Sequence, residues 1–333
     1  MRFMHSAALC AAALTLTVPS LAFGKDAQPV KVQGSKDAAK GTSQVAVGAF
    51  NVGFIFESID QTATSGGLMG AFGGTTKAKS SLVGVTPEMM QAITDQAYAD
   101  FTAQLAAKGF TVLQPAALFG HPAMAKTKGQ KVPLDINLAL EKGSKGKATY
   151  YKPTALPLLV MIPGDFVGSG MSSMGINMAA GQSAYAMSTY AKAAGVSVVD
   201  VVYLIDFSNQ KRPGAFSFGG LQVNSGLSVT SGFSRLSVIS PGGKQGSLTI
   251  NEPVAVEGEF VEKSDASSGF DKTSQAVGNV AGGVAAAFGM GGLGFGKTRK
   301  FEFTAKPGNY ETGATKAASL ASERLIAQLV SMR

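Results

Sequence analysis

The chain has 333 residues, and its 29 Lys and Arg against 21 Asp and Glu give a formal net charge of +8. The apolar content is 45%, and 42 glycines predict many loops and tight turns. The length allows one large domain or two small ones.

The first 24 residues have the layout of a cleaved secretory signal. Arg2 precedes an apolar run from Ala7 to Val18, and small residues follow at Ala22 and Gly24. The run is shorter than the ~20 residues of a membrane-spanning helix, so we favour a removed signal over an anchor. We therefore expect a periplasmic or secreted protein.

Cys10 is the only cysteine and lies inside this signal. Leu9 precedes it where a lipoprotein signal needs a small residue, which disfavours lipid attachment. The mature chain would carry no thiol, which excludes disulfides, thiolate metal sites and cysteine nucleophiles.

Polar residues 25–43 predict a disordered leader, and Gln44–Phe56 is the first convincing strand. A long connection follows, with a glycine-rich insertion at 61–85. Thr86-Pro87-Glu88 then has the pattern of a helix start. The buried face predicted for this helix comprises Met90, Ile93, Ala97, Phe101 and Leu105. Gly109 ends the helix, and Phe110–Leu113 opens a strand.

The middle of the chain predicts a short helix at Ala116–Ala125 and mostly loop from Lys126 to Lys152 around the apolar patch Leu134–Leu140. Leu156–Ile162 predicts a further strand. The loop is rich in lysines, namely Lys126, Lys128, Lys131, Lys142, Lys145 and Lys147. We interpret them as a solvated surface and expect no nucleic acid to bind, although anionic lipid remains a candidate partner.

Ser183–Phe207 predicts a helix, ended by Gly195, that leads directly into a strand buried on both faces. Asp200 and Asp206 interrupt that apolar strand. Each carboxylate either lies at the end of the sheet, accepts hydrogen bonds from the backbone, or is functional.

After Phe207 the pattern changes to hairpins. Leu227–Val229 and Leu236–Ile239 flank a turn, and Pro241-Gly242-Gly243 returns the chain into Ser247–Ile250. Val254–Val261 follows. The closing helix, Thr312–Val330, is expected to point Ala317, Leu320, Ala321, Leu325 and Leu329 inward.

These elements predict a single α/β domain over 44–331, with a mixed sheet, helices on its faces and an antiparallel hairpin edge. Glycine-rich insertions are expected at 61–85 and 276–299.

The order of elements resembles that of CsgG-like and TolB-N-terminal-like periplasmic domains. The likeness rests on an opening VAVGAFNV strand, helices ending in AAKGFTVLQP and AKAAGVSVVDVVYLIDF, a hairpin with a glycine turn, and a closing ASERLIAQLV helix. It implies a non-enzymatic envelope scaffold or pore subunit that associates with itself near the outer membrane. The chain departs from the pattern in lacking a lipobox and in its longer glycine-rich insertions.

Few residues point to catalysis. Gly291–Thr298 matches the spacing of a phosphate-binding loop, but a strand-like segment follows where a helix is needed. His121 is the one histidine outside the signal, and no G-x-S-x-G motif presents a serine to it. We expect no metal, no cofactor and no enzyme, and keep a hydrolase that uses His121 as an alternative.

Methionines cluster at Met161, Met171, Met174, Met178 and Met187. Thioethers bind copper(I), so a copper carrier is one interpretation. The helical spacing of Met171, Met174 and Met178 favours ordinary core packing, because methionine fills irregular cores.

The two glycine-rich insertions share Leu, Met and Phe without acidic residues. We predict that a membrane, an apolar ligand or another subunit contacts Leu68, Met69, Phe72, Phe288, Met290, Leu293 and Phe295. The opposing interpretation is that their aromatic rings tuck against the sheet.

The sequence therefore predicts a non-enzymatic binding or scaffold protein of the cell envelope. Its expected partners are an envelope protein or a membrane surface, and a homo-oligomer formed through the glycine-rich loops is a further candidate. A periplasmic carrier of an apolar small molecule is the other alternative.

Overall fold

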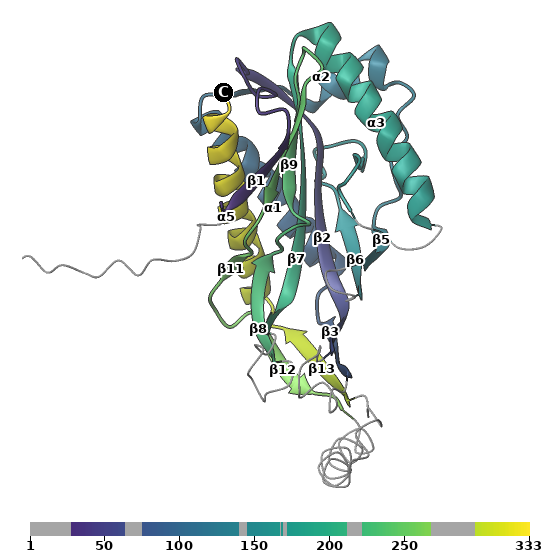
Figure 1. The fold of residues 1–333 in the computed structure, drawn as a ribbon, viewed down its shortest axis with the longest axis vertical. Coiled ribbons are helices and arrows are strands. Elements are labelled where there is room, and N and C mark those ends of the chain that lie inside the picture. Colours follow the sequence, from purple (N-terminus) through teal and green to yellow (C-terminus); the bar gives the residue numbers. More distant parts are fainter. Residues whose placement is uncertain are drawn as a thin grey trace, which may run out of the picture.

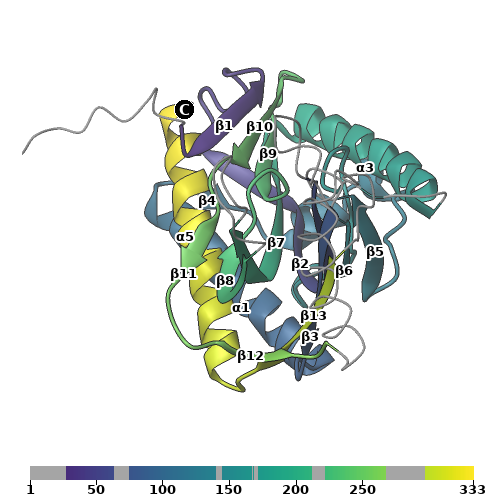
Figure 2. The same ribbon diagram turned by 60° about the horizontal axis from the view of Figure 1, so that its bottom comes forward.

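A computed structural model of the chain describes residues 28–63, 75–139, 145–166, 168, 172–211, 222–267 and 297–333. One large mixed sheet forms the middle layer, with α1 and α5 on one face and α2 and α3 on the other (Figure 1). Figure 2 shows the same arrangement from another side, with α5 and α3 separated by β7 and β2. The expected α/β class, with helices on both faces of a mixed sheet, is confirmed.

The main path of the sheet runs β1 (Val30–Gly34), β10 (Gln245–Ile250), β9 (Arg235–Ile239), β7 (Ser197–Lys211), β2 (Gln44–Ala63), β3 (Thr75–Val83), β13 (Lys297–Ala305) and β12 (Val261–Asp265). Beside it lie β4 (Thr111–Val112) and β6 (Lys145–Tyr151) on β2, β5 (Leu134–Ala139) on β6, β8 (Gln222–Val229) on β7, and β11 (Val254–Val256) on β8. The helices are α1 (Pro87–Ala107), α2 (Pro115–Phe119), the 3-10 turn Pro122–Met124, α3 (Ser172–Ala194) and α5 (Asn309–Ser331).

The predicted central strand is confirmed as β7, which lies between β9 and β2. Its side chains alternate between the two faces of the sheet. Tyr203 packs edge-on against Phe50 on the α1 and α5 face, and its hydroxyl shares a hydrogen bond of 2.8 Å with that of Ser322 in α5. Val198 lies on the α3 face with Met187. Helices thus cover both faces, as the apolar run predicted.

Helix α1 follows its sequence signals closely. The Thr86 hydroxyl accepts a hydrogen bond from the Met89 amide at 3.3 Å, and Pro87 opens the helix. All five residues of the predicted buried face are buried. Gly109 has the left-handed φ of 81° that a helix end favours. In α5 the prediction holds for four of five residues, since Leu320 is 37% exposed.

Strand β2 has different hydrogen-bonded partner strands in its first and second halves. It pairs with β7 up to Phe54 and with β3 from Glu57 onward, while β6 borders it across both stretches. Because a strand has only two edges, β3 takes over the edge that β7 leaves. The sheet therefore forks: one branch continues as β7 and β8, and the other as β2, β3, β13 and β12. Phe207 and Phe303 join the branches, with ring centroids 5.1 Å apart.

Several sequence predictions were wrong. The expected leader, 25–43, contains β1, because Val30 and Val32 gain a pairing partner in β10, far along the chain. The expected loop at 126–152 contains the β5–β6 hairpin, which includes Lys145 and Lys147. The connection assigned to 57–85 is largely strand, since β2 runs to Ala63 and β3 begins at Thr75.

Two further predictions concern strand pairing. Leu156–Ile162 forms no strand and makes only the isolated bridge of Leu159 with Gln130. The hairpin expected between β8 and β9 is also absent among the described strands. Instead both pair with β7, β9 along Val198–Val202 and β8 along Ile205–Lys211.

Candidate functional site

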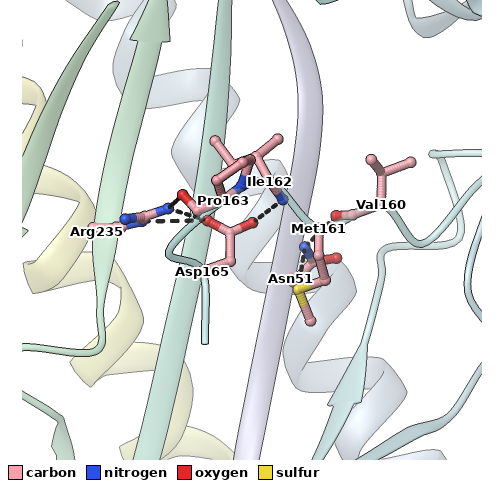
Figure 3. A network of polar contacts seen from close by, with 7 residues as sticks. All are labelled: Asn51, Val160, Met161, Ile162, Pro163, Asp165 and Arg235. Atoms are coloured by element: carbon pink, nitrogen blue, oxygen red, sulfur yellow. Dashed lines mark hydrogen bonds and ion pairs between the residues drawn. The ribbon is translucent and has the colours of Figure 1, made fainter. Parts of the chain in front are cut away.

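A buried polar cluster joins the segment 160–165 to β9 and β2 (Figure 3). Arg235, the first residue of β9, forms an ion pair with Asp165, whose carboxylate oxygen lies 2.9 Å from the guanidinium. The same guanidinium donates to the carbonyl of Pro163. The other oxygen of Asp165 accepts a hydrogen bond from the Ile162 amide at 2.7 Å. Asp165 is 3% exposed and the Arg235 side chain 13%.

Asn51 of β2 completes this network. Its amide donates to the Val160 carbonyl at 2.7 Å and lies 3.7 Å from the Met161 sulfur. The segment 156–166 therefore obtains polar partners from side chains of the sheet instead of from strand pairing. This explains why an apolar run that resembles a strand packs on the sheet without joining it.

Asp200 of β7 lies in the same region and is 2% exposed. Neither of its carboxylate oxygens has a hydrogen-bond partner of normal geometry among the described residues, although the Ala49 amide is close enough to favour the charged form. Burial raises the pKa of Asp200 well above its usual range, and the negative charge of Asp165 adds to this. Arg235 opposes the shift. Asp165 is therefore the carboxylate that pairs with Arg235, and the surroundings of Asp200 favour its protonated form.

Asp206, the other acid of β7, has a different environment. Its carboxylate accepts hydrogen bonds from the amide and hydroxyl of Ser208 at 3.0 and 3.2 Å. Burial raises its pKa to about 6, and the charge of Asp60 contributes to the increase. Asp206 thus has the backbone hydrogen bond that was one of the expected alternatives, whereas the Ala49 amide approaches Asp200 without normal hydrogen-bond geometry.

A second site lies where β2 ends. Ile59 of β2 is flanked by Lys79 of β3 on one side and Lys145 of β6 on the other, so all three side chains point to one face. Lys77 and Lys147 lie on the same face, two residues away along their strands. All four lysines are exposed. We call Lys77, Lys79, Lys145 and Lys147 the basic end.

The charges on this face are unevenly distributed. Glu57 is paired with Lys147, and Glu302 of β13 lies on the same face, two residues along from Lys300. In contrast, Lys79 and Lys145 lie on either side of the uncharged Ile59, and no acidic residue is paired with either lysine in the described strands. Opposite charge that approaches this face would stabilise the two exposed lysines together. The row through Ile59 therefore favours an anionic partner.

Four connections leave the sheet at this end. They join β2 to β3, β5 to β6, β7 to β8, and β12 to β13, and Figure 1 shows β3, β12 and β13 together at the bottom of the molecule. Parallel pairing of Lys297 with Thr76 puts the beginning of β13 beside the beginning of β3. The strands that border both glycine-rich insertions are therefore immediate neighbours, which the sequence did not reveal.

No family model, curated protein or solved structure matches this chain. What the protein binds must therefore be inferred from its own surfaces.

The contact residues predicted in the glycine-rich insertions, Leu68, Met69, Phe72, Phe288, Met290, Leu293 and Phe295, lie outside the described residues. So do Lys142, Met171 and the glycines of the phosphate-loop pattern. Lys297 and Thr298 of that pattern open β13, where a phosphate-binding loop requires a helix.

Core packing was predicted for Met174 and Met178 and is wrong, because both lie on the outer face of α3 and are 66% and 65% exposed. Met161 and Met187 are buried as expected. Copper binding by the cluster gains no support, since two of these methionines face the core and two face outward.

His121 caps the 3-10 turn. Its ring nitrogen accepts a hydrogen bond from the Ala123 amide at 3.1 Å, and its ring packs edge-on against Tyr190. No hydrogen bond connects it to a serine or an acid in the described part of the chain. Groups of three metal-binding side chains are likewise lacking among the described residues.

A hollow of about 590 Å³ lies at the opposite end of the sheet. Charged and hydroxyl side chains dominate its lining, including the ion pair of Asp37 with Lys244. Such a lining does not suit an apolar small molecule. None of the helices that the structure describes is long and apolar enough to cross a membrane.

Proposed function

We propose that this protein is an exported, non-enzymatic binding or scaffold protein of the cell envelope that attaches to an anionic membrane surface through its basic end. The observation that carries the proposal is the group of four exposed lysines on one face, at the strand ends where four connections leave the sheet. The signal-like residues 1–24 support the proposed compartment.

The spacing of the lysines suits a surface better than a single small ion. Lys79 and Lys145 are two strands apart, or about 10 Å. A planar array of lipid headgroups can neutralise such separated charges together. Each lysine near an anionic leaflet contributes about 1 kcal/mol, so four supply about 4 kcal/mol. The attachment is therefore expected to be reversible and to weaken with salt.

The buried polar cluster supports a scaffold more than an enzyme. Asp165 and Arg235 are occupied with each other and with the segment 162–165. The Asp200 carboxyl faces the side chain of Met187 across Gly48 and is closed off from solvent. Acid–base catalysis requires contact with a substrate, which this packing does not offer.

Vesicle flotation tests the proposal. The purified chain is mixed with vesicles of anionic phospholipid and, separately, with vesicles of phosphatidylcholine alone. The test variant carries Lys77→Gln, Lys79→Gln and Lys145→Gln. The matched control carries Lys36→Gln, Lys40→Gln and Lys108→Gln, which remove the same charge from exposed positions at the other end of the sheet.

We expect the parent and the control to float with anionic vesicles and the test variant to lose at least tenfold in binding. Binding to phosphatidylcholine should be weak in every case. Equal loss in both variants would show that only net charge matters, and no flotation of the parent would reject the membrane surface as the partner.

A further inference from the structure

Helix α3 carries an exposed apolar stripe on the face opposite the sheet. Met174, Met178 and Tyr185 are 66%, 65% and 77% exposed, the highest exposures among the large apolar side chains of the described residues. The remaining member of the stripe is Gly181, where an added methyl group would have no neighbouring atom within 4 Å. The opposite face of the same helix is anchored by Ala180, Met187, Tyr190 and Ala191, which are buried.

The stripe has the spacing of a helix-pairing seam. Positions 174, 178, 181 and 185 are separated by four, three and four residues, the repeat that keeps one edge of a helix facing a partner helix. The seam runs from Met174 to Tyr185, a separation of about 16 Å along the helix. An amphipathic surface helix would instead place polar residues here.

The stripe is also complementary to itself. When two copies of α3 run antiparallel about an axis midway between Ala179 and Ala180, Met174 of one faces Tyr185 of the other. Met178 then faces Gly181, so a long side chain enters the space that a glycine leaves. Both contacts occur twice by symmetry, as an isologous interface requires.

The charge distribution favours a second copy over other occupants. The sequence has no charged residue between Asp165 and Lys192, although the whole chain carries a net charge of +8. Two copies of a strongly basic protein repel each other where their lysines come close. Their repulsion is weakest where each copy presents an uncharged face to the other. An anionic membrane or an acidic partner would instead be matched by lysines along the stripe, and α3 has only Lys192 near its end.

We propose that the protein forms a two-fold symmetric dimer in which α3 packs antiparallel against α3 of a second copy, with Met174 against Tyr185 and Met178 against Gly181. The interface is independent of the basic end. Its short seam places it below the standard interface size, so the dimer is weak and its dissociation constant lies in the micromolar range.

Sedimentation velocity at concentrations from about 1 to 300 µM, a range that brackets micromolar affinity, tests dimerisation. The parent should shift from monomer to dimer across this range. Met178→Glu introduces two close like charges at the seam and should shift the midpoint at least tenfold upward. Val330→Glu, an apolar-to-acid change at a position of α5 that is 38% exposed, should leave it unchanged. Circular dichroism confirms that both variants are folded.

Cross-linking tests the register. A chain that begins at Lys25 has no cysteine, so single introduced cysteines report individual positions. Met174→Cys mixed with Tyr185→Cys should give a cross-linked heterodimer with a short thiol reagent. Neither variant should cross-link with itself, because identical positions are about 16 Å apart along the antiparallel axis.

Three outcomes overturn the proposal. A parent that stays monomeric at the highest concentration has no such interface. Self-cross-linking of Met174→Cys would show a parallel or unrelated arrangement. If the parent is monomeric and Met178→Glu abolishes binding to neutral vesicles, the stripe contacts lipid. Failure of flotation with anionic vesicles would leave the dimer unaffected, so the two proposals are separately testable.

Discussion

Replacing Arg235 with methionine tests whether the buried ion pair holds segment 156–166 on the sheet. The Arg235→Met variant keeps most of the side-chain volume but leaves Asp165, which is 3% exposed, without its cation. Removing one partner of a buried pair costs about 3–5 kcal/mol. Since the arginine side chain is 13% exposed and Asp165 keeps its bond from the Ile162 amide, we expect a loss of about 3 kcal/mol, at the lower end of that range.

The loss should depend on pH. Burial raises the pKa of Asp165, and Arg235 opposes this effect, so the folded-state pKa rises further in the variant. An acid whose pKa is raised by folding loses its proton first from the unfolded chain, so stability falls as pH increases from the unfolded pKa toward the folded one. The deficit of Arg235→Met should therefore be small near pH 4 and largest above neutrality.

Guanidinium unfolding followed by far-ultraviolet circular dichroism provides the measurement, because the chain contains no tryptophan. The double variant Asp165→Asn with Arg235→Met removes both charges and should recover part of the loss. A deficit below about 1 kcal/mol at pH 8, the value of an exposed pair, would refute the assignment of a buried ion pair. So would a deficit that is the same at pH 4 and pH 8.

Two further predictions concern the neighbouring carboxyl group. Asp200→Asn should stabilise the fold above neutral pH by about 1–3 kcal/mol, because the unfolded parent releases the Asp200 proton there and the folded parent, with its raised pKa, resists doing so. Near pH 4 the substitution should have little effect. The same unfolding assay provides the measurement. Equal changes in stability at pH 4 and above neutral pH would contradict the conclusion that the folded chain favours protonated Asp200. Gly48→Ala should destabilise by about 1–3 kcal/mol through overpacking, because its methyl group would lie 2.6 Å from an oxygen of Asp200 and 2.8 Å from the sulfur of Met187. A thermal midpoint equal to that of the parent would show that α3 shifts to accommodate the methyl group and that the site is not tightly packed. Gly175→Ala, whose methyl group would have no neighbouring atom within 4 Å, is the matched control.

The parts of the fold that the sequence predicted are those defined by short-range patterns. The buried face of α1 repeats within a few residues, and Thr86 and Gly109 mark its ends locally. Strand β7 is buried on both faces, so its apolar run needs no information about its neighbours. The class of fold follows from such segments.

The errors arose where a segment depends on distant partners. Strand β1 is stabilised by β10, which lies more than 200 residues away, and its own polar composition resembles that of a linker. Segment 156–162 is apolar like a strand, but Asn51 and Arg235 satisfy the polar groups around it. Periodicity alone cannot distinguish these cases.

The candidate sites were less predictable still. Asp165 and Arg235 are 70 residues apart, and nothing local marks them as a pair. The basic end requires knowledge that β3 and β6 border the same part of β2. The exposure of Met174 and Met178 depends on which face of α3 meets the sheet, and helical spacing is the same for either face.

The length of β2 has a consequence for how the molecule opens. At 20 residues, or about 65 Å, it is bonded to β7 in one half and to β3 in the other, with β6 spanning the change. Neither branch of the fork can separate without breaking the ladder of this one strand. Amide protons from Val45 to Phe54 should therefore exchange with solvent only through global unfolding, and the two branches should lose protection in a single cooperative step.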